Sequence, residues 1–221
     1  EIDDFLALVE KPARYIGGEE GSIVKKHDGK LLFALAFPEV YEIGASHFGG
    51  QIIYNIVNNE PDIACERVYM PWNDMRIIMR KRGIPLVTLE SKTPLADFHV
   101  LGFTLENELS CTNILEMLDM SDIPIQARER SASMPFVIGG GVGAFHPEPL
   151  ADFFDAFFVG DAEAGFIDVL KHIKSARDAG VDRKNILSQI AQFPGVYIPS
   201  MYDARFDGGQ FTRFIAMDGA P

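Results

Sequence analysis

The chain has 221 residues, of which 47% are hydrophobic and 24% charged, and this balance is typical of a globular protein and excludes a disordered one. It carries 20 Lys and Arg against 32 Asp and Glu, a formal net charge of −12 that disfavours binding to nucleic acid or to an anionic membrane surface. No apolar run approaches the roughly 18 residues of a membrane span.

The first 180 residues show repeated alternation of short apolar runs with amphipathic stretches. Core strands are predicted at residues 31–37, 64–70, 98–103, 136–138 and 154–159, with a short extra strand at 86–89. Helices are predicted from a Ser46 cap to 58–59, from 73 or 74 to 83, over 110–120 and over 162–176. Strands that are apolar throughout and alternate with helices predict a doubly wound, mainly parallel, five-stranded α/β sheet.

The character of the chain changes after Gly180. A short helix is predicted over 182–191, a strand over 194–199, and a β-hairpin from 201–206 and 210–215 joined by Asp207-Gly208-Gly209. We therefore expect an α/β domain over 1–180, with 1–30 as a lead-in, and a helix and hairpin appendage over 181–221. Because the chain lacks an initiator Met and a signal peptide, and its end looks like a cut, we expect a cytoplasmic piece of a longer protein.

A glycine-rich segment follows the fourth core strand, where ligands bind in open parallel sheets. Gly139, Gly140 and Gly141 would let a ligand approach the backbone closely, although they also suit a flexible turn. The spacing resembles a dinucleotide fingerprint, but the prolines that follow at 147 and 149 cannot continue the helix that the fingerprint requires. We therefore exclude a dinucleotide site.

His47, with Gly50 three residues later, is the second candidate. A neutral imidazole at a helix start suits a metal ligand, although such a histidine can also simply pack or form hydrogen bonds. The remaining polar pairs are weaker candidates: His146 with Glu148, Glu106 with Glu108, and Asp161 with Glu163. Cys65 and Cys111 are too few for a disulfide scaffold or an all-cysteine zinc site, and we expect free thiols. No nucleotide-binding lysine loop or serine nucleophile motif occurs, so the sequence predicts no catalytic residues.

Several segments together resemble a known family. They are 12–19 (PARYIGGE), 33–44 (FALAFPEVYEIG), 65–68 (CERV), 139–141 (GGG) and 147–155 (PEPLADFFD). The chain resembles the N-terminal region of an uncharacterised bacterial group of cobalamin-binding-type radical S-adenosylmethionine (radical SAM) proteins. The resemblance implies a flavodoxin-like, cobalamin-binding-type domain that precedes a radical SAM barrel in the same polypeptide. The 4Fe–4S cluster and S-adenosylmethionine would belong to that barrel, because the three-cysteine motif is absent here.

The resemblance also suggests cofactor contacts, residue by residue. Cobalamin domains resemble D-x-H-x-x-G after strand one, S-x-L after strand three and G-G after strand four. His47 and Gly50 match the first pattern, although Ala45 replaces its Asp, whose loss typically costs about 10–100-fold in metal affinity. Thr104 stands for the Ser, Glu106 replaces the Leu, and Gly139 and Gly140 match the last pattern. The resemblance thus implies His47 as cobalt ligand or corrin contact, Thr104 as a hydrogen-bond donor, and the glycines as the entry for the nucleotide tail.

Three alternatives remain open at this point. Many radical SAM enzymes bind cobalamin without a histidine ligand. Large rings at Phe37, Phe103 and Phe136 could instead close the cavity, leaving a vestigial scaffold that docks substrate or a partner domain through residues 69–72. A flavin carrier is disfavoured, because Glu39 and Glu42 would repel its phosphate.

Overall fold

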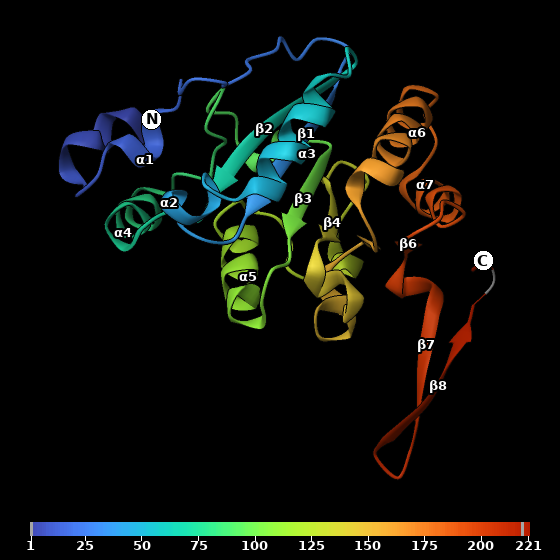
Figure 1. Cartoon of the computed structure of the whole chain (residues 1–221). Helices are drawn as coiled ribbons and strands as arrows, with labels where there is room; N and C mark the ends of the chain where they lie inside the picture. Colours follow the sequence, from blue (N-terminus) through green and yellow to red (C-terminus); the bar gives the residue numbers. More distant parts are fainter. Residues whose placement is uncertain (1, 218) are drawn as a thin grey trace.

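A computed structural model describes residues 2–217 and 219–221. Its main element is a six-stranded sheet with the order β2-β1-β3-β4-β5-β6 (Figure 1). The strands are β1 Leu31–Phe37, β2 Ile63–Tyr69, β3 Val100–Thr104, β4 Phe136–Gly140, β5 Ala156–Phe158 and β6 Val196–Tyr197. The first five are parallel, and β6 joins β5 in antiparallel orientation. This order is that of flavodoxin-like domains, so the predicted fold class is confirmed, with one short edge strand in addition.

Helices cover both faces of the sheet. They are α1 Ala13–Ile16, α2 Tyr41–Gly44, α3 Phe48–Asn58, α4 Asn73–Arg82, α5 Cys111–Asp119, α6 Phe166–Asp178 and α7 Arg183–Ile190. Short 3-10 helices lie between them, at Ile2–Leu8, Leu95–Asp97, Glu108–Ser110, Ala127–Glu129, Val142–Phe145, Glu148–Phe153, Ala162–Ala164 and Pro199–Met201. The buried side chains of α3, α6 and α7 pack on one face, and those of α4 and α5 pack on the other. None of the helices in the described part of the chain is long and apolar enough to cross a membrane.

Strand β1 forms the centre of both cores. All seven of its residues are buried, with Leu31, Phe33 and Leu35 in the core beneath α3 and α6, and Leu32 and Ala34 in the opposite core. Each large apolar side chain buried in this way stabilises the fold by roughly 1.5–3 kcal/mol. The continuous apolar run in the sequence therefore corresponds to a strand buried on both faces.

Local structure differs from the sequence prediction at three places. His47, and not Ser46, caps α3, because the Ser46 hydroxyl already donates to the carbonyls of Glu42 and Ile43. Residues 86–89 form one isolated bridge, between Val87 and Pro94, in place of a strand. The predicted helix over 162–176 is divided, because Gly165 adopts an extended φ between a 3-10 turn and α6.

The C-terminal hairpin consists of β7 Tyr202–Asp207 and β8 Gln210–Ala216, a separate two-stranded sheet that projects from the main body (Figure 1). Gly208 and Gly209 both adopt positive φ at its turn, which side chains with a Cβ rarely tolerate. The predicted hairpin is confirmed to within a residue. The division of the chain at residue 180 stays a prediction.

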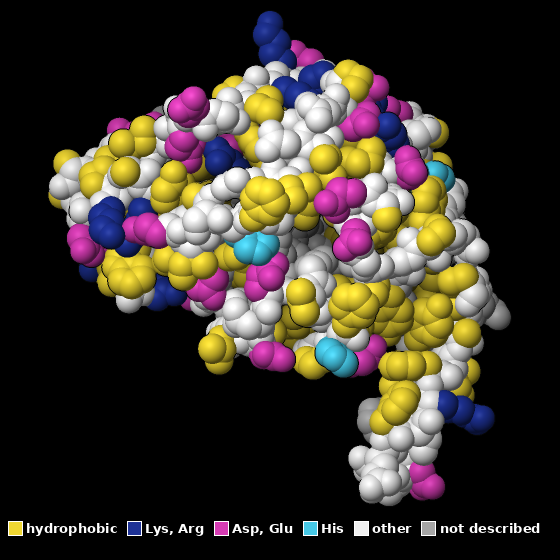
Figure 2. Space-filling model, in the orientation of Figure 1, with side chains coloured by type: hydrophobic (Ala, Val, Ile, Leu, Met, Phe, Trp, Pro, Cys, Tyr) yellow, Lys and Arg dark blue, Asp and Glu magenta, His cyan; other side chains and the backbone are white. Residues whose placement is uncertain are grey.

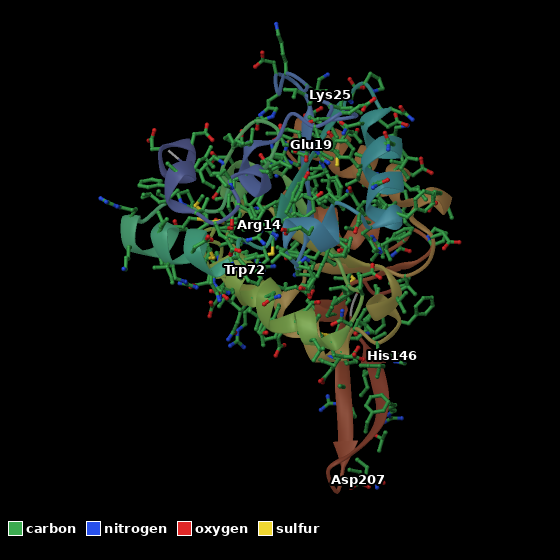
Figure 3. The ribbon with its side chains drawn as sticks, turned by 60° about the vertical axis from the view of Figure 1, so that its left-hand side comes forward. Arg14, Glu19, Lys25, Trp72, His146 and Asp207 are labelled. Atoms are coloured by element: carbon green, nitrogen blue, oxygen red, sulfur yellow. The ribbon has the colours of Figure 1, made fainter. Side chains whose placement is uncertain are left out.

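A charged contact fastens the N-terminal lead-in to the sheet domain. The Arg14 Nε donates to Glu42 Oε1 at 2.9 Å, and the Arg14 guanidinium lies 4.8 Å from the ring centre of Trp72, which Figure 3 shows beside it. The hydrogen bond from Arg14 lowers the pKa of Glu42 from 4.5 to about 2. Because the folded-state pKa is depressed, this contact stabilises the lead-in fully above pH 4.5 and is lost as the pH falls toward 2.

We expect acid to release the lead-in, with Trp72, the single tryptophan, as reporter. Its fluorescence emission should change between pH 4.5 and pH 2, and Glu42→Gln should show the acid-like emission already at pH 7. Glu20→Gln, at an exposed position of the same segment, should behave like the unmodified chain. Identical titrations for Glu42→Gln and the unmodified chain would contradict the assignment.

Candidate ligand-binding site

A cavity of about 260 Å³ opens at the carboxyl edge of the sheet, between the starts of α3 and α6. Figure 2 shows a hollowed face there, with a histidine, acidic side chains and hydrophobic side chains around it. The lining includes His47, Thr104, Gly139, Gly140 and Gly141, so five of the six site residues predicted from the sequence meet at one place. Gly50 instead lines a second cavity, of about 310 Å³, together with Tyr54, Arg67 and Tyr69.

Aromatic rings form the floor of the first cavity. The Phe33 ring lies across Gly102 on the neighbouring strand, where a Cβ would be 2.5 Å from its Cζ. Phe166 packs edge-on against Phe33 and Phe158, with ring centres 5.6 and 5.4 Å apart. Sequence analysis missed Phe33, although a glycine inside a buried strand was a signal of close approach.

Of the three residues that were expected to close the cavity, Phe37 and Phe136 do not line it, whereas Phe103 does. Phe103 belongs to the opposite core, where its ring packs against Phe154 at 6.0 Å between ring centres. Phe136 lies under the Arg183 guanidinium at 4.3 Å. Phe37 contacts the His47 ring at 5.0 Å and lines the second cavity. The first cavity is therefore open above its Phe33 floor.

Thr104 brings an unpaired hydroxyl to this cavity. Its residue is 5% exposed, and its Oγ1 has no hydrogen-bond partner among the residues that the structure describes. A buried polar group left unpaired costs about 1–3 kcal/mol, so a stable fold normally satisfies it. The position suits a ligand that offers a polar atom to Thr104 Oγ1.

The three consecutive glycines meet different surroundings. A Cβ on Gly139 would lie 2.8 Å from Leu105 Cδ1 and from the Phe157 ring, whereas the nearest atom to a Cβ on Gly140 is a carbonyl oxygen at 3.9 Å. Gly141 has a φ of +95°, which favours glycine. Gly139 therefore serves packing, Gly141 serves the turn, and Gly140 leaves space in the cavity.

His47 is held by hydrogen bonding at the start of α3. Its Nδ1 accepts from the backbone N–H of Gly50 at 3.0 Å, and its Nε2 lies 3.5 Å from Glu106 Oε1. In the neutral ring the proton must then reside on Nε2, the nitrogen that faces the cavity side chain Glu106. A cobalt ligand needs a free lone pair at the metal-facing nitrogen and a donor proton at the other. The arrangement favours a capping role for His47 over cobalt ligation.

The comparison with known families gives one result. A family model described as "Radical SAM proteins, N-terminal" matches residues 49–199, more than half of the chain. The chain belongs to this family. No curated protein and no solved structure matches it.

In this radical SAM N-terminal region, the matched residues include Thr104 and the three cavity glycines, but the match begins after His47. The resemblance to a radical SAM protein is thereby confirmed, and its cobalamin-binding detail stays a prediction. Within the described residues, no group of three or more His, Cys, Asp or Glu side chains could hold a metal ion. The Glu148 carboxylate, beside His146 in the sequence, accepts from the Tyr197 hydroxyl at 2.9 Å.

Both cysteines of this family member are free thiols. Cys65 is fully buried in β2, and burial raises its pKa well above the ordinary value. Cys111 is partly buried at the start of α5, and burial raises its pKa as well. Raised pKa values disfavour the reactive thiolate at both positions, which does not suit a nucleophile.

Proposed function

We propose that this chain is an accessory N-terminal domain of a radical SAM enzyme and that it binds cobalamin at the carboxyl edge of the sheet without catalytic residues of its own. The observation that carries the proposal is the buried, unpaired Thr104 hydroxyl beside a cavity that Gly140 leaves open. The iron–sulfur cluster and S-adenosylmethionine belong, in this proposal, to the radical SAM domain.

The cavity suits the nucleotide tail of cobalamin better than the corrin ring. Its volume of about 260 Å³ lies below the range of about 300–1,000 Å³ that is usual for whole ligands, so part of a molecule would enter. The benzimidazole base of the tail is flat and apolar, and when it is detached from cobalt it carries one ring nitrogen acceptor. The aromatic rings of the cavity floor would pack against the face or the edge of this base, and Thr104 Oγ1 would donate a hydrogen bond to its ring nitrogen. Cobalamin bound in this way would supply a cobalt centre for methyl or radical transfer.

Acidic residues around the cavity narrow the choice of ligand. Glu106, Asp161 and Glu163 line its opening, and their carboxylates would accept hydrogen bonds from the amide groups around a corrin ring. The same carboxylates would repel a phosphate, so the phosphate of the nucleotide tail would lie away from them. The charge at the opening therefore supports the neutral amides of a corrin ring as its neighbours.

The test compares cobalamin with cobinamide, the analogue that lacks the nucleotide tail. After incubation with hydroxocobalamin and desalting, we expect the visible spectrum of the corrin to remain with the chain, and no such retention with cobinamide. Thr104→Val should weaken cobalamin binding about 2- to 10-fold, the value of one hydrogen bond, whereas Thr112→Val at an exposed threonine should not. Failure to retain cobalamin, or equal retention of cobinamide, would overturn the proposal.

A scaffold that docks a partner without cofactor is the second candidate. Of its expected surface, Tyr69 to Trp72, Met70 is buried in the core, whereas Trp72 is exposed with the Arg14 guanidinium beside its ring. Other apolar side chains at the carboxyl edge are more exposed, and these favour a docking role. Retention of neither corrinoid in the test above is the result that this candidate predicts.

A further inference from the structure

Large apolar side chains are exposed around the carboxyl edge of the sheet. Leu109 is 87% exposed and Phe48 is 73% exposed. We call the whole set the edge surface; it consists of Ile43, Phe48, Trp72, Leu109, Val142 and Phe145. They lie on the segments that follow β1, β2, β3 and β4. Because these four strands are parallel neighbours, their carboxyl ends meet at one edge. An apolar set of this size on the same edge as a cavity is typical of an interaction site.

Acidic side chains are interspersed with the edge surface. Glu106 and Glu108 precede Leu109 after β3, and Asp161 and Glu163 follow β5 at the same edge. Figure 2 shows acidic and hydrophobic side chains side by side around the hollow. Complementarity requires a partner with an apolar centre and surrounding Lys or Arg side chains. A second copy of this chain fits poorly, since each copy carries a net charge of −12.

We propose that the edge surface docks the radical SAM domain of the same protein, through apolar residues surrounded by basic ones. The family description, an N-terminal region of radical SAM proteins, names the class of partner domain, and the charge of the edge surface specifies the complementary face. Docking here would cover the opening of the cavity from outside. Docking does not require cobalamin, so the docking proposal and the cobalamin proposal can fail independently.

The test uses the 221-residue chain and the radical SAM domain expressed separately from the same gene, without cobalamin. We expect binding that weakens as salt rises, with hydrogen-exchange protection of residues 47–50, 107–110 and 142–146 in the complex. Leu109→Glu and Phe145→Glu should each raise the Kd at least about tenfold, because that factor corresponds to about 1.4 kcal/mol and the central anchors of an interface carry this much or more.

Val24→Glu is the matched control. Val24 is 68% exposed and adjoins Lys25, which Figure 3 places at the end of the molecule opposite His146. It should leave the Kd unchanged. Equal weakening by Val24→Glu, protection confined to the hairpin at 202–216, or protection of the edge surface by dimerisation of the chain alone would each overturn the proposal. Binding without retention of cobalamin would support docking and reject the cofactor role.

Discussion

Asp155→Ala should cost about 3–5 kcal/mol of unfolding free energy, because it leaves buried charge without a partner. Asp155 Oδ2 accepts from Arg130 Nη1 at 2.9 Å and from the backbone N–H of Val137 at 2.8 Å, and Arg183 Nη2 lies 2.8 Å from it. The Arg130 side chain is fully buried. Urea unfolding followed by far-UV circular dichroism measures the loss.

Asp152→Ala is the control for this prediction. Asp152 is exposed, three residues before Asp155, and its replacement should change stability by less than about 0.5 kcal/mol. Equal unfolding midpoints for the two variants would show that the buried network contributes little.

The hydrogen bonds of Arg130 and Asp155 also help to position the candidate site. Arg130 also donates to the carbonyls of Pro124, Ile125 and Phe153, so one side chain joins the loops on both sides of β4. Asp155 holds the Val137 amide within β4, three residues before Gly140. Fixing β4 in this way fixes the position of the glycine that opens the cavity.

The strands were predictable because their sequence pattern is local. Apolar runs such as 31–37 and 136–138 indicate strands buried on both faces, and proline or glycine ends them. β6 was predicted as an isolated strand, and its place at the edge of the main sheet depends on a two-residue pairing with β5 that no local pattern shows. Residues 86–89 look similar in sequence, but among them only Val87 forms a β-bridge, with Pro94.

The location of the candidate site could be predicted from the sequence, but the contacts of its side chains could not. Because loops after parallel strands meet at one edge, the sequence indicated that His47, Thr104 and the glycines would converge. It could not show that Nδ1 of His47 accepts the Gly50 amide, since that bond depends on the backbone path before α3. Nor could it show that Phe33 lies across Gly102, because that contact joins residues far apart in the chain.

Gly140→Leu should abolish cobalamin retention while leaving the domain folded. The Gly140 backbone does not adopt positive φ, and a Cβ there meets no atom closer than 3.9 Å, so a leucine side chain can enter the cavity without strain. Burial of that side chain would offset or exceed any local cost, at roughly 1.5–3 kcal/mol. Desalting with hydroxocobalamin measures retention, and urea unfolding measures stability.

Gly139→Leu should instead destabilise the fold, because successive strand residues face opposite sides of the sheet and Gly139 faces the core. A Cβ at Gly139 would lie 2.8 Å from Leu105 and Phe157 in a filled core, and overpacking of this kind typically costs about 1–3 kcal/mol or more. The pair of variants therefore separates filling the cavity from disturbing the fold. If Gly140→Leu were stable and still retained cobalamin as the unmodified chain does, the nucleotide tail would not occupy this cavity.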